Sequence, residues 1–431
     1  MAKQSPQMAF TSLAYLMDLD WLKEAYRRTR KDGAVGVDGV TAGEYEQDLE
    51  GNLQRLLDRA KSGTYRAPPV RRVHIPKGGS TTETRPIGIP TLEDKILQRA
   101  VVMLLEPIYE QDFLDCSYGF RPGRSAHQAL ESFRAQLMGC RGGYVLEVDI
   151  RKFFDNLDHG HLQAFLQLRV RDGVLLRLIG KWLRAGVMED GSVSYPDSGS
   201  PQGGVVSPLL SNVFLHYVLD LWFEHDVKPR LRDRAFLTRF ADDLVIGFRD
   251  ERDARRVLEV IPKRFGKYGL TIHPTKSRLV PFRPSAPCAN DDRHEPDERG
   301  GTFDLLGFTH YWARSRRGYW VVKVKTAADR FSRAVRSIDS WCQTNRHLPL
   351  REQQQKLNEK LRGHYAYYGV TGNGSALSRL RHEAERRWRK WLLRRNRERA
   401  LPWACFRRLL QRFPLAPVRT VHSAYRRAAN P

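Results

Sequence analysis

The chain has few cysteines and no long apolar run, and both features limit the cellular compartments in which we expect it. Its 431 residues include five cysteines, which are Cys116, Cys140, Cys288, Cys342 and Cys405. Because they are odd in number, scattered and never paired as CxxC, they favour neither a disulfide framework nor a zinc site. No stretch approaches the roughly 18 apolar residues of a membrane-spanning helix. The N-terminus also lacks the basic and apolar regions of a secretory signal. We therefore expect a soluble, cytoplasmic protein without a membrane partner.

Acidic residues are scarce in the last third of the chain. The whole chain has 73 Lys and Arg against 49 Asp and Glu, a net charge of +24. Residues 1–300 hold 44 basic and 41 acidic residues, whereas residues 301–431 hold 29 basic and only 8 acidic ones. A sustained excess of positive charge calls for a polyanionic partner, either nucleic acid or an anionic membrane surface. Aromatic residues interleaved with the arginines favour nucleic acid.

The hydropathy pattern predicts an α+β protein. Apolar residues at helical spacing predominate at the two ends of the chain, and β-branched runs lie between them. The predicted helices cover parts of 1–60 on either side of a glycine-rich loop at 33–40, then 91–108, 205–222, 258–268 and the chain beyond 326. The predicted strands form a hairpin within 65–90, a single strand at 144–150, and a second hairpin of 236–240 with 244–248. A polar loop rich in Pro and Gly is expected at 283–301.

Three aspartates stand where these strands end. Asp149 closes the single strand, and Asp242 and Asp243 form the tip of the second hairpin within RFADDLVIGF. A surface turn would more often carry Gly or Asn between such flanks. If adjacent strands bring the three carboxylates together, their repulsion demands cations, and an all-oxygen set suits Mg²⁺. Two such ions about 4 Å apart promote phosphoryl transfer. That chemistry leaves a polymerase and a nuclease both open.

A series of motifs narrows the choice. In chain order they are GVDGVTAGEY (36–45), RPIGIPTLEDKILQRAV (85–101), SYGFRPGRSAHQAL (117–130), VLEVDIRKFFDNLDH (145–159), GSPQGGVVSPLLSNVFLHYVLD (199–220), LTRFADDLVIGF (237–248), GLTIHPTKSRL (269–279), FDLLGFTH (303–310) and LNEKLRGHYAYYGV (357–370). The series resembles the conserved blocks of bacterial group II intron-encoded reverse transcriptases, also called maturases. The resemblance covers roughly residues 30–430.

The resemblance implies a right-hand polymerase with fingers, a palm built on an antiparallel sheet, and a helical thumb. It divides the chain into an N-terminal extension with helical segments (1–60), the reverse transcriptase fingers and palm (61–310), and a basic thumb or maturase (X) domain (311–431). Family members often end in an HNH endonuclease with paired cysteines. No such segment is expected here, so the DNA nick that insertion requires would come from elsewhere.

The resemblance also implies roles for single residues. Asp149, Asp242 and Asp243 match the catalytic aspartates that bind two Mg²⁺ ions, for which Mn²⁺ can substitute. Phe240 stands where the family commonly has Tyr, which removes a hydroxyl but leaves the carboxylates unaffected. The residues that match nucleotide contacts are Lys77 and Arg85 at the triphosphate, Phe154 as the ring that excludes a 2′-hydroxyl, Gln202 and Gly203 in the SPQGG loop, and Lys276 as a general acid for departing pyrophosphate.

Further arginines are candidates for binding nucleic acid. Arg121 and Arg124 are expected either to face the template backbone or to brace the palm. The candidates in the basic region are Arg362, Arg386, Arg387 and Arg389.

The function that the resemblance implies is RNA-directed DNA synthesis. The expected partners are an RNA template, a DNA primer, deoxynucleotide triphosphates and the protein's own group II intron RNA, whose splicing and retrotransposition it would assist. Two alternatives stay open. One is a splicing cofactor that binds RNA without synthesis, against which the three aspartates argue. The other is a domesticated relative that serves host DNA repair or defence. The oligomeric state is left undetermined.

Overall fold

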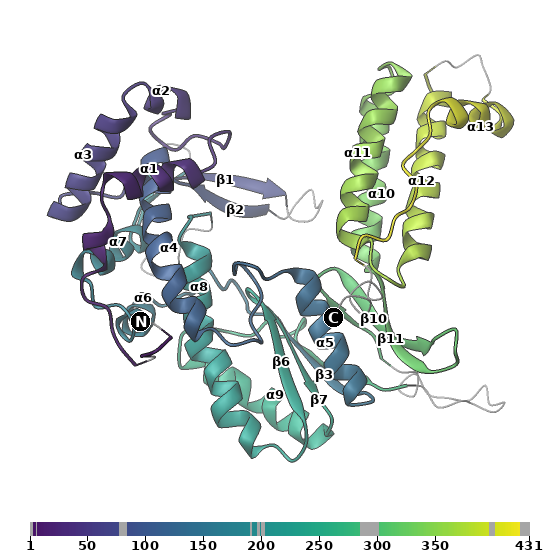
Figure 1. Ribbon diagram of the computed structural model, residues 1–431. Helices are drawn as coiled ribbons and strands as arrows, with labels where there is room; N and C mark the ends of the chain where they lie inside the picture. The colour runs from purple at the N-terminus through teal and green to yellow at the C-terminus, as the bar shows by residue number, and fades with distance from the viewer. Residues whose placement is uncertain are drawn as a thin grey trace. The chain divides into compact units, whose positions relative to one another are not determined.

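The computed structural model describes residues 3–5, 7–76, 84–189, 192–195, 199, 203–284, 301–395 and 401–422. These residues belong to two units, Met1–Val280 and Pro281–Pro431, whose helices and strands are shown in Figure 1. Each unit has a hydrophobic core of its own. Within the described part of the chain, no helix is long and apolar enough to cross a membrane.

The first unit mixes helices and strands along the chain. Its helices are α1 (Leu19–Arg28), α2 (Ala42–Glu46), α3 (Leu49–Ser62), α4 (Leu92–Asp112), α5 (Ala126–Gly139), α6 (His159–Gln167), α7 (Gly173–Leu183), α8 (Ser207–Leu215) and α9 (Glu251–Gly266). Its strands are β1 (Val70–Pro76), β2 (Thr84–Ile89), β3 (Gly143–Val148), β4 (Val187–Glu189), β5 (Ser192–Ser194), β6 (Ala235–Phe240) and β7 (Asp243–Phe248). One further strand, β8 (Arg278–Phe282), runs across the boundary into the second unit.

The predicted helices and strands of this unit are confirmed, although several of their bounds differ. The helix predicted at 205–222 continues beyond α8 as two π-helical stretches, His216–Asp220 and Trp222–Val227. Helix α9 begins earlier than predicted because the Asp250 side chain accepts a hydrogen bond from the Asp253 amide and caps the helix there. The predicted loop at 283–301 lies almost wholly outside the described residues.

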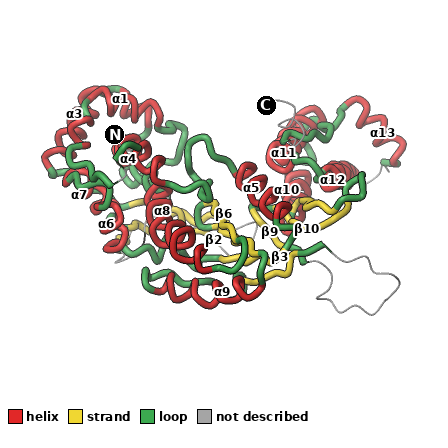
Figure 2. The backbone as a smooth tube through the Cα atoms, turned by 60° about the horizontal axis from the view of Figure 1, so that its bottom comes forward, coloured by secondary structure: helices red, strands yellow, loops and turns green. Residues whose placement is uncertain are grey.

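A four-stranded sheet in the order β6-β7-β3-β8 lies at the centre of the first unit. Strands β6, β7 and β3 pair antiparallel, so alternate side chains face opposite sides of the sheet. On one side, Phe236 of β6 meets Phe133 of α5 edge to face. On the other, Leu146 and Ile246 join the main core together with the apolar face of α9. Helices α5 and α9 thus cover opposite faces of the sheet (Figure 2).

A second sheet, in the order β2-β1-β4-β5, carries the predicted hairpin of β1 and β2. This hairpin leads directly into α4, because Thr91 ends the extended chain and caps the helix by accepting from the Asp94 amide. Helix α4 is buried along most of its length. The strand that is expected to carry nucleotide-binding residues is therefore anchored to the core of the unit.

The second unit opens with a sheet that the hydropathy pattern did not predict. Its elements are β9 (Phe303–Leu305), β10 (Phe308–Arg314), β11 (Trp320–Thr326), α10 (Ala328–Thr344), α11 (Leu350–Tyr368), α12 (Gly374–Leu393) and α13 (Trp403–Arg412). The strands form an antiparallel sheet in the order β11-β10-β9. The helices confirm the prediction of a helical region beyond residue 326. The expected domain boundary at residue 311 lies inside β10, whereas the two units divide after Val280.

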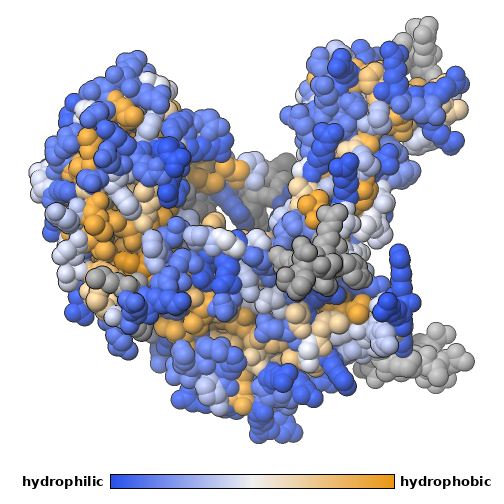
Figure 3. Space-filling model, in the orientation of Figure 1, coloured by the Kyte–Doolittle hydropathy of each residue, from blue (hydrophilic) through white to orange (hydrophobic). Residues whose placement is uncertain are grey.

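The helices of the second unit pack around a buried tryptophan. Trp388 of α12 is fully buried, and its indole N–H donates to Gln353 of α11 at 2.9 Å. Since the core is confined to the inner faces of these helices, their outer faces are free to carry charge. Figure 3 shows that the visible surface of this unit is predominantly hydrophilic.

Candidate active site

The site is built on the tight hairpin that joins β6 and β7. Phe240 and Asp243 pair across it, which leaves Ala241 and Asp242 as the connecting residues. Ala241 has a φ of +57°, a left-handed conformation that costs a non-glycine residue free energy. Gly119 permits this turn, since a Cβ there would stand 2.3 Å from the Ala241 nitrogen. The hairpin tip is therefore held in an unusual conformation by a close backbone neighbour.

Asp149 lies beside this hairpin, as the strand pattern predicted. Its predecessor Val148 pairs with Leu244 of β7, so the end of β3 adjoins the hairpin tip. Burial and the negative charge of Asp149 raise the pKa of Asp242 above its ordinary range. This mutual repulsion indicates that the two carboxylates are close enough to interact. Asp243 starts β7 and is exposed.

The segment at 271–277 holds Asp149 in place and adds a cation. The Asp149 carbonyl accepts from the His273 amide at 2.8 Å, and its amide donates to the Ser277 hydroxyl at 3.1 Å. The same segment brings the Lys276 ammonium to 3.3 Å from the Asp149 carboxylate. The Lys276 side chain remains 52% exposed. Lys276 therefore pairs with Asp149 while much of its side chain is open to solvent.

Arg85 supplies a second cation from a different sheet. It is exposed on β2, opposite Ile75 of β1. Its positive charge lowers the pKa of Asp242, in opposition to the burial of that carboxyl group. The guanidinium thus acts electrostatically on Asp242.

The predicted gate residue, Phe154, lies in the loop after β3. Its ring is half-buried and packs edge to face on Phe153. Gly199 reaches this loop from the other side, because a Cβ there would stand 2.9 Å from the Phe154 carbonyl oxygen. The Gly199 amide also donates to the Leu157 carbonyl at 3.0 Å. One end of the glycine-rich segment therefore abuts the Phe154 loop.

The other end of that segment meets β2. Gly203 has a φ of +124°, and a Cβ on it would stand 2.4 Å from the Gly88 carbonyl oxygen. The amides of Val205 and Val206, just beyond it, donate to the Gln98 side-chain oxygen of α4 at 2.7 and 3.3 Å. The predicted contacts Lys77 and Gln202 lie outside the described residues.

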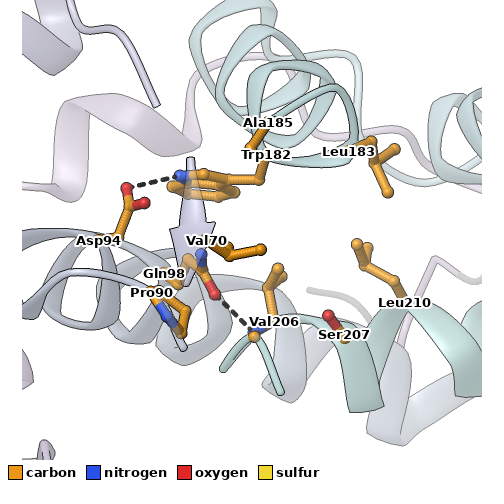
Figure 4. Close-up of a pocket in the computed structure, with 11 residues that line it drawn as sticks. Val70, Pro90, Asp94, Gln98, Trp182, Leu183, Ala185, Val206, Ser207 and Leu210 are labelled. Atoms are coloured by element: carbon orange, nitrogen blue, oxygen red, sulfur yellow. Dashed lines mark hydrogen bonds between the residues drawn. The ribbon is translucent and has the colours of Figure 1, made fainter. Parts of the chain in front are cut away.

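A small cavity lies next to Gln98 and Val206, where the glycine-rich segment meets α4 (Figure 4). Gln98 and Asp94 project into it from α4, and Trp182 closes it from α7. The Trp182 indole N–H donates to Asp94 at 3.2 Å. Burial raises the pKa of Asp94 to about 7. The cavity lies between α4, α7 and α8, and the residues that line it include Gln98, which binds the end of the glycine-rich segment.

The structure assigns the two arginines of SYGFRPGRS different roles. Arg121 has a side chain only 4% exposed, and its donors are taken up by Glu110 and by the carbonyls of Phe113, Leu114 and Ser117. It braces the fold, which is the second of the two roles expected for it. Arg124 is partly exposed and pairs with Asp115 at 2.6 Å. That partner is itself exposed, so Arg124 remains accessible to an anion.

The candidate arginines of the second unit also differ. Arg362 is exposed on α11, and Arg386 is exposed on α12, where it pairs with Glu383. Arg387 also pairs with Glu383 and is less exposed. Arg389 donates twice to the Leu401 carbonyl, at 2.9 and 2.7 Å, and thereby ties α12 to the chain before α13. Arg362 and Arg386 are the two best placed for contact with a partner.

Sequence reasoning made no prediction for Arg239, which lies directly beneath the site. Its side chain is 0% exposed and pairs with Asp220 at 2.5 Å. It also donates to the Ala241 carbonyl at 3.1 Å. An arginine within the apolar strand FLTRF was the available signal, because a buried charge requires a buried partner.

The donor set suits a hard divalent cation. Asp149 and Asp242 offer only carboxylate oxygens, and the pKa of Asp242 is raised first by burial and then by the charge of Asp149, both of which a nearby cation would offset. Among the described residues, no three His, Cys, Asp or Glu side chains are already gathered into a metal-binding cluster. The fit therefore rests on the interacting pair and the chemistry of its oxygens.

Two family models match the chain. One, described as reverse transcriptase (RNA-dependent DNA polymerase), matches residues 75–310. The other, described as the maturase-specific domain of group II introns, matches residues 331–409.

Individual relatives cover parts of the chain. Protein YkfC of Escherichia coli is 43% identical over 203 residues, which are 46% of this chain and 53% of YkfC. The group II intron-encoded protein LtrA of Lactococcus lactis is 39% identical over 222 residues, 50% of this chain and 37% of LtrA. A putative COX1/OXI3 intron 2 protein of Saccharomyces cerevisiae is 26% identical over 388 residues, 77% of this chain and 41% of that protein. The aligned regions thus span about half of these relatives' lengths or less.

Proposed function

This chain belongs to the reverse transcriptase (RNA-dependent DNA polymerase) family, and we propose that it copies RNA into DNA by nucleotidyl transfer. In that reaction a primer 3′-hydroxyl attacks the α-phosphorus of a deoxynucleotide triphosphate, and pyrophosphate leaves. The observation that carries the proposal is the meeting of Asp149 and Asp242, from two neighbouring strands, with the charges of Arg85 and Lys276.

The basic residues would stabilise the triphosphate. Arg85 presents a planar guanidinium that can bind two phosphate oxygens, and Lys276 presents a mobile ammonium. Lys276 would leave the Asp149 carboxylate when the nucleotide enters, and its Nζ proton would pass to the departing pyrophosphate. Lys77 would add a further contact at the triphosphate, and Gln202 and Gly203 would contact the nucleotide from the glycine-rich segment.

Asp149, Asp242 and Asp243 would hold Mg²⁺ or Mn²⁺. Such ions supply activation of the attacking hydroxyl and charge stabilisation at the leaving oxygen. What the chain itself supplies is the fixed separation of its carboxylates, set by the pairing of β3 with β7 and by the tight hairpin. Phe154 would exclude ribonucleotides, because a half-buried ring cannot retreat to admit a 2′-hydroxyl.

The second unit would bind nucleic acid through charge and shape. It contains the match to the maturase-specific domain, and residues 301–431 within it carry 29 of the 73 basic residues against 8 acidic ones. We assign residues 1–60 to an N-terminal extension, 61–310 to fingers and palm, and 311–431 to the thumb or maturase domain. This last domain would clamp the template–primer duplex in the cytoplasm and bind the protein's own intron RNA to assist its splicing and mobility.

Primer extension on an RNA template with deoxynucleotides and Mg²⁺ tests the proposal. We expect the natural protein to synthesise DNA and the Asp242→Asn/Asp243→Asn variant to lose synthesis while still binding RNA. Asp32→Asn/Asp58→Asn is the matched control, because it removes the same charge from exposed positions of the first unit. Synthesis by the doubly substituted hairpin variant at the natural rate would refute the assignment.

A further inference from the structure

The buried Arg239 connects the catalytic hairpin to the core of the first unit. Its side chain is 0% exposed, as is that of Asp220, with which it forms a two-point ion pair at 2.8 and 2.5 Å. A charge this deeply buried is costly unless every donor is paired. Asp220 lies in the first π-helical stretch after α8, so the pair joins that helix to β6.

The remaining donors of Arg239 converge on the surroundings of the hairpin tip. Its Nη1 donates to the Ala241 carbonyl at 3.1 Å and to Asn212 at 2.9 Å, and its Nη2 donates to the Ser117 hydroxyl at 2.8 Å. Together with the two bonds to Asp220, these account for all five guanidinium N–H groups. The orientation of the guanidinium is therefore fixed from every side.

Asn212 extends this network to the opposite side of the tip. Its side-chain oxygen accepts from Arg239, and its amide nitrogen donates to the Gly119 carbonyl at 2.7 Å. Gly119 in turn abuts the nitrogen of Ala241. The peptide groups on both sides of Ala241 are thus held, one through a hydrogen bond to its carbonyl and one through a close backbone contact.

A contribution to stability alone would not explain this arrangement. A buried ion pair is often replaceable by apolar residues without loss of stability. Arg239, however, also donates a hydrogen bond to the carbonyl of Ala241, the residue immediately before Asp242. Ala241 is the residue with the left-handed φ. Releasing that carbonyl would allow Ala241 to relax and would turn the Asp242 carboxylate away from Asp149.

We propose that Arg239, held by Asp220 and Asn212, is a positioning residue that fixes the backbone of Ala241 so that Asp242 faces Asp149. The inference rests on the proposed function in that Asp242 and Asp149 act together on a divalent cation. Beyond that function, the buried Arg239 guanidinium would set the geometry of Asp242 and Asp149 without contacting the substrate.

The test compares two buried arginines that differ in their position. Arg239→Lys keeps the charge but removes the fork that reaches both Asp220 and Ala241. Arg169→Lys is the matched control, because the Arg169 side chain is also buried, at 3% exposed, and also pairs with an aspartate, Asp112, at 2.7 Å. Unlike Arg239, it donates to the carbonyl of Met8 near the N-terminus and not to the catalytic hairpin. Both variants should unfold at a lower temperature than the natural protein.

Only Arg239→Lys should impair the site. We expect Arg239→Lys to weaken Mn²⁺ binding about tenfold, as measured by electron paramagnetic resonance on the protein without nucleic acid. We also expect it to lower kcat by about tenfold to a hundredfold. KM for the deoxynucleotide should stay within about twofold in both variants, because Arg85 and Phe154 are untouched. Equal Mn²⁺ affinity and equal kcat in folded Arg239→Lys and Arg169→Lys would overturn the proposal.

A milder variant keeps the proposal testable if Arg239→Lys does not fold. Ser117→Ala removes a single acceptor from the Nη2 group and should lower kcat several-fold without changing RNA affinity. An unchanged kcat and unchanged Mn²⁺ affinity in Ser117→Ala would then overturn it. Weakened Mn²⁺ binding in a protein whose natural form makes no DNA would support the positioning role and refute the polymerase assignment instead.

Discussion

At the scale of single residues, burial sets what each carboxyl group can do. Asp94 and Asp242 both have a raised pKa, but their surroundings differ. Asp242 shares its site with Asp149 and with opposing cations, which suits the proposed role of holding a metal ion. Asp94 faces Trp182 and has its pKa raised to about 7 by burial and, to a lesser extent, by the charge of Asp38. It is a structural acid that stays largely protonated below neutrality.

This difference predicts a pH dependence of stability. Because the folded pKa of Asp94 lies above its ordinary value of 3.8, the folded protein binds more protons than the unfolded chain between about pH 4 and pH 7. The contribution of Asp94 to the free energy of unfolding should therefore be greatest below pH 4 and be lost as the pH rises to 7, by up to about 4 kcal/mol. Urea unfolding at several pH values should show this decline in the natural protein and a flatter curve in Asp94→Asn. Parallel curves would contradict it.

Phe154 is predicted to decide which sugar the site accepts. Replacing it with Ala should admit ribonucleotides and lower the preference for deoxynucleotides by about tenfold or more, because in the proposed role the half-buried ring would fill the space that a 2′-hydroxyl needs. The measurement is the ratio of kcat/KM for the two nucleotide types. Phe154→Tyr, which keeps the ring, should retain the preference. A ratio unchanged by Phe154→Ala would remove the gate assignment.

The motifs of the sequence name candidate residues, but they do not show the contacts that burial decides. The motifs identified Asp149 and Asp242, and the structure brings them within electrostatic reach of each other. They could not tell that Arg121 is saturated by Glu110 and backbone carbonyls. The motifs also contain Arg239 and Asp220 without showing that the two pair, because the partners stand 19 residues apart on different elements.

At the scale of elements, the hairpin of β6 and β7 depends on close backbone packing. Gly119→Ala should displace it, because the new Cβ would stand 2.3 Å from the Ala241 nitrogen and the backbone cannot yield as a side chain would. We expect the unfolding free energy to decrease by roughly 1–3 kcal/mol. The rate of DNA synthesis by the folded protein should decrease as well, because the displaced hairpin carries Asp242.

Gly139→Ala is the matched control for this substitution. Gly139 ends α5, and no heavy atom lies within 4 Å of a Cβ built on it. The change should be neutral or slightly stabilising, because it reduces the freedom of the unfolded chain. Thermal melts and primer extension on both variants check the contrast. A fully active Gly119→Ala protein would show that the hairpin is less constrained than its packing indicates.

Elements with a regular period were predictable, whereas those set by tertiary packing were not. The β-branched runs predicted the hairpins of both sheets, and the apolar spacing predicted α4 and the helices beyond residue 326. The sheet of β9, β10 and β11 was not predicted, because β9 is only three residues long and two lysines alternate with the apolar residues of β11. The change of pitch after α8 depends on packing that no local pattern records.

At the scale of the whole molecule, charge and catalysis are separated along the sequence. Residues 1–300 are nearly neutral and contain the aspartates, whereas residues 301–431 carry most of the excess positive charge. Binding of RNA should therefore weaken steeply with salt through the second unit.

The exposed arginines of that unit should set part of the salt dependence. Arg362→Gln/Arg386→Gln should reduce the slope of log affinity against log salt concentration by about 2, one for each phosphate that is no longer neutralised. The matched control is Arg27→Gln/Arg30→Gln, which removes two exposed arginines of the first unit that pair with acidic neighbours. Filter binding over a salt series measures both. An equal change in the two variants would mean that net charge alone, and no local surface, governs binding.

The most direct test of the account asks whether Asp149 and Asp242 act as one unit. The measurement is the single-turnover rate of adding one deoxynucleotide to a saturating RNA–DNA template–primer, for Asp149→Asn, Asp242→Asn and the double variant. We predict that each single substitution slows addition by about 10³-fold or more, that the double variant is scarcely slower, and that template–primer affinity is unchanged. Retention of the natural rate by either single variant, or effects that simply multiply in the double variant, would contradict a shared site.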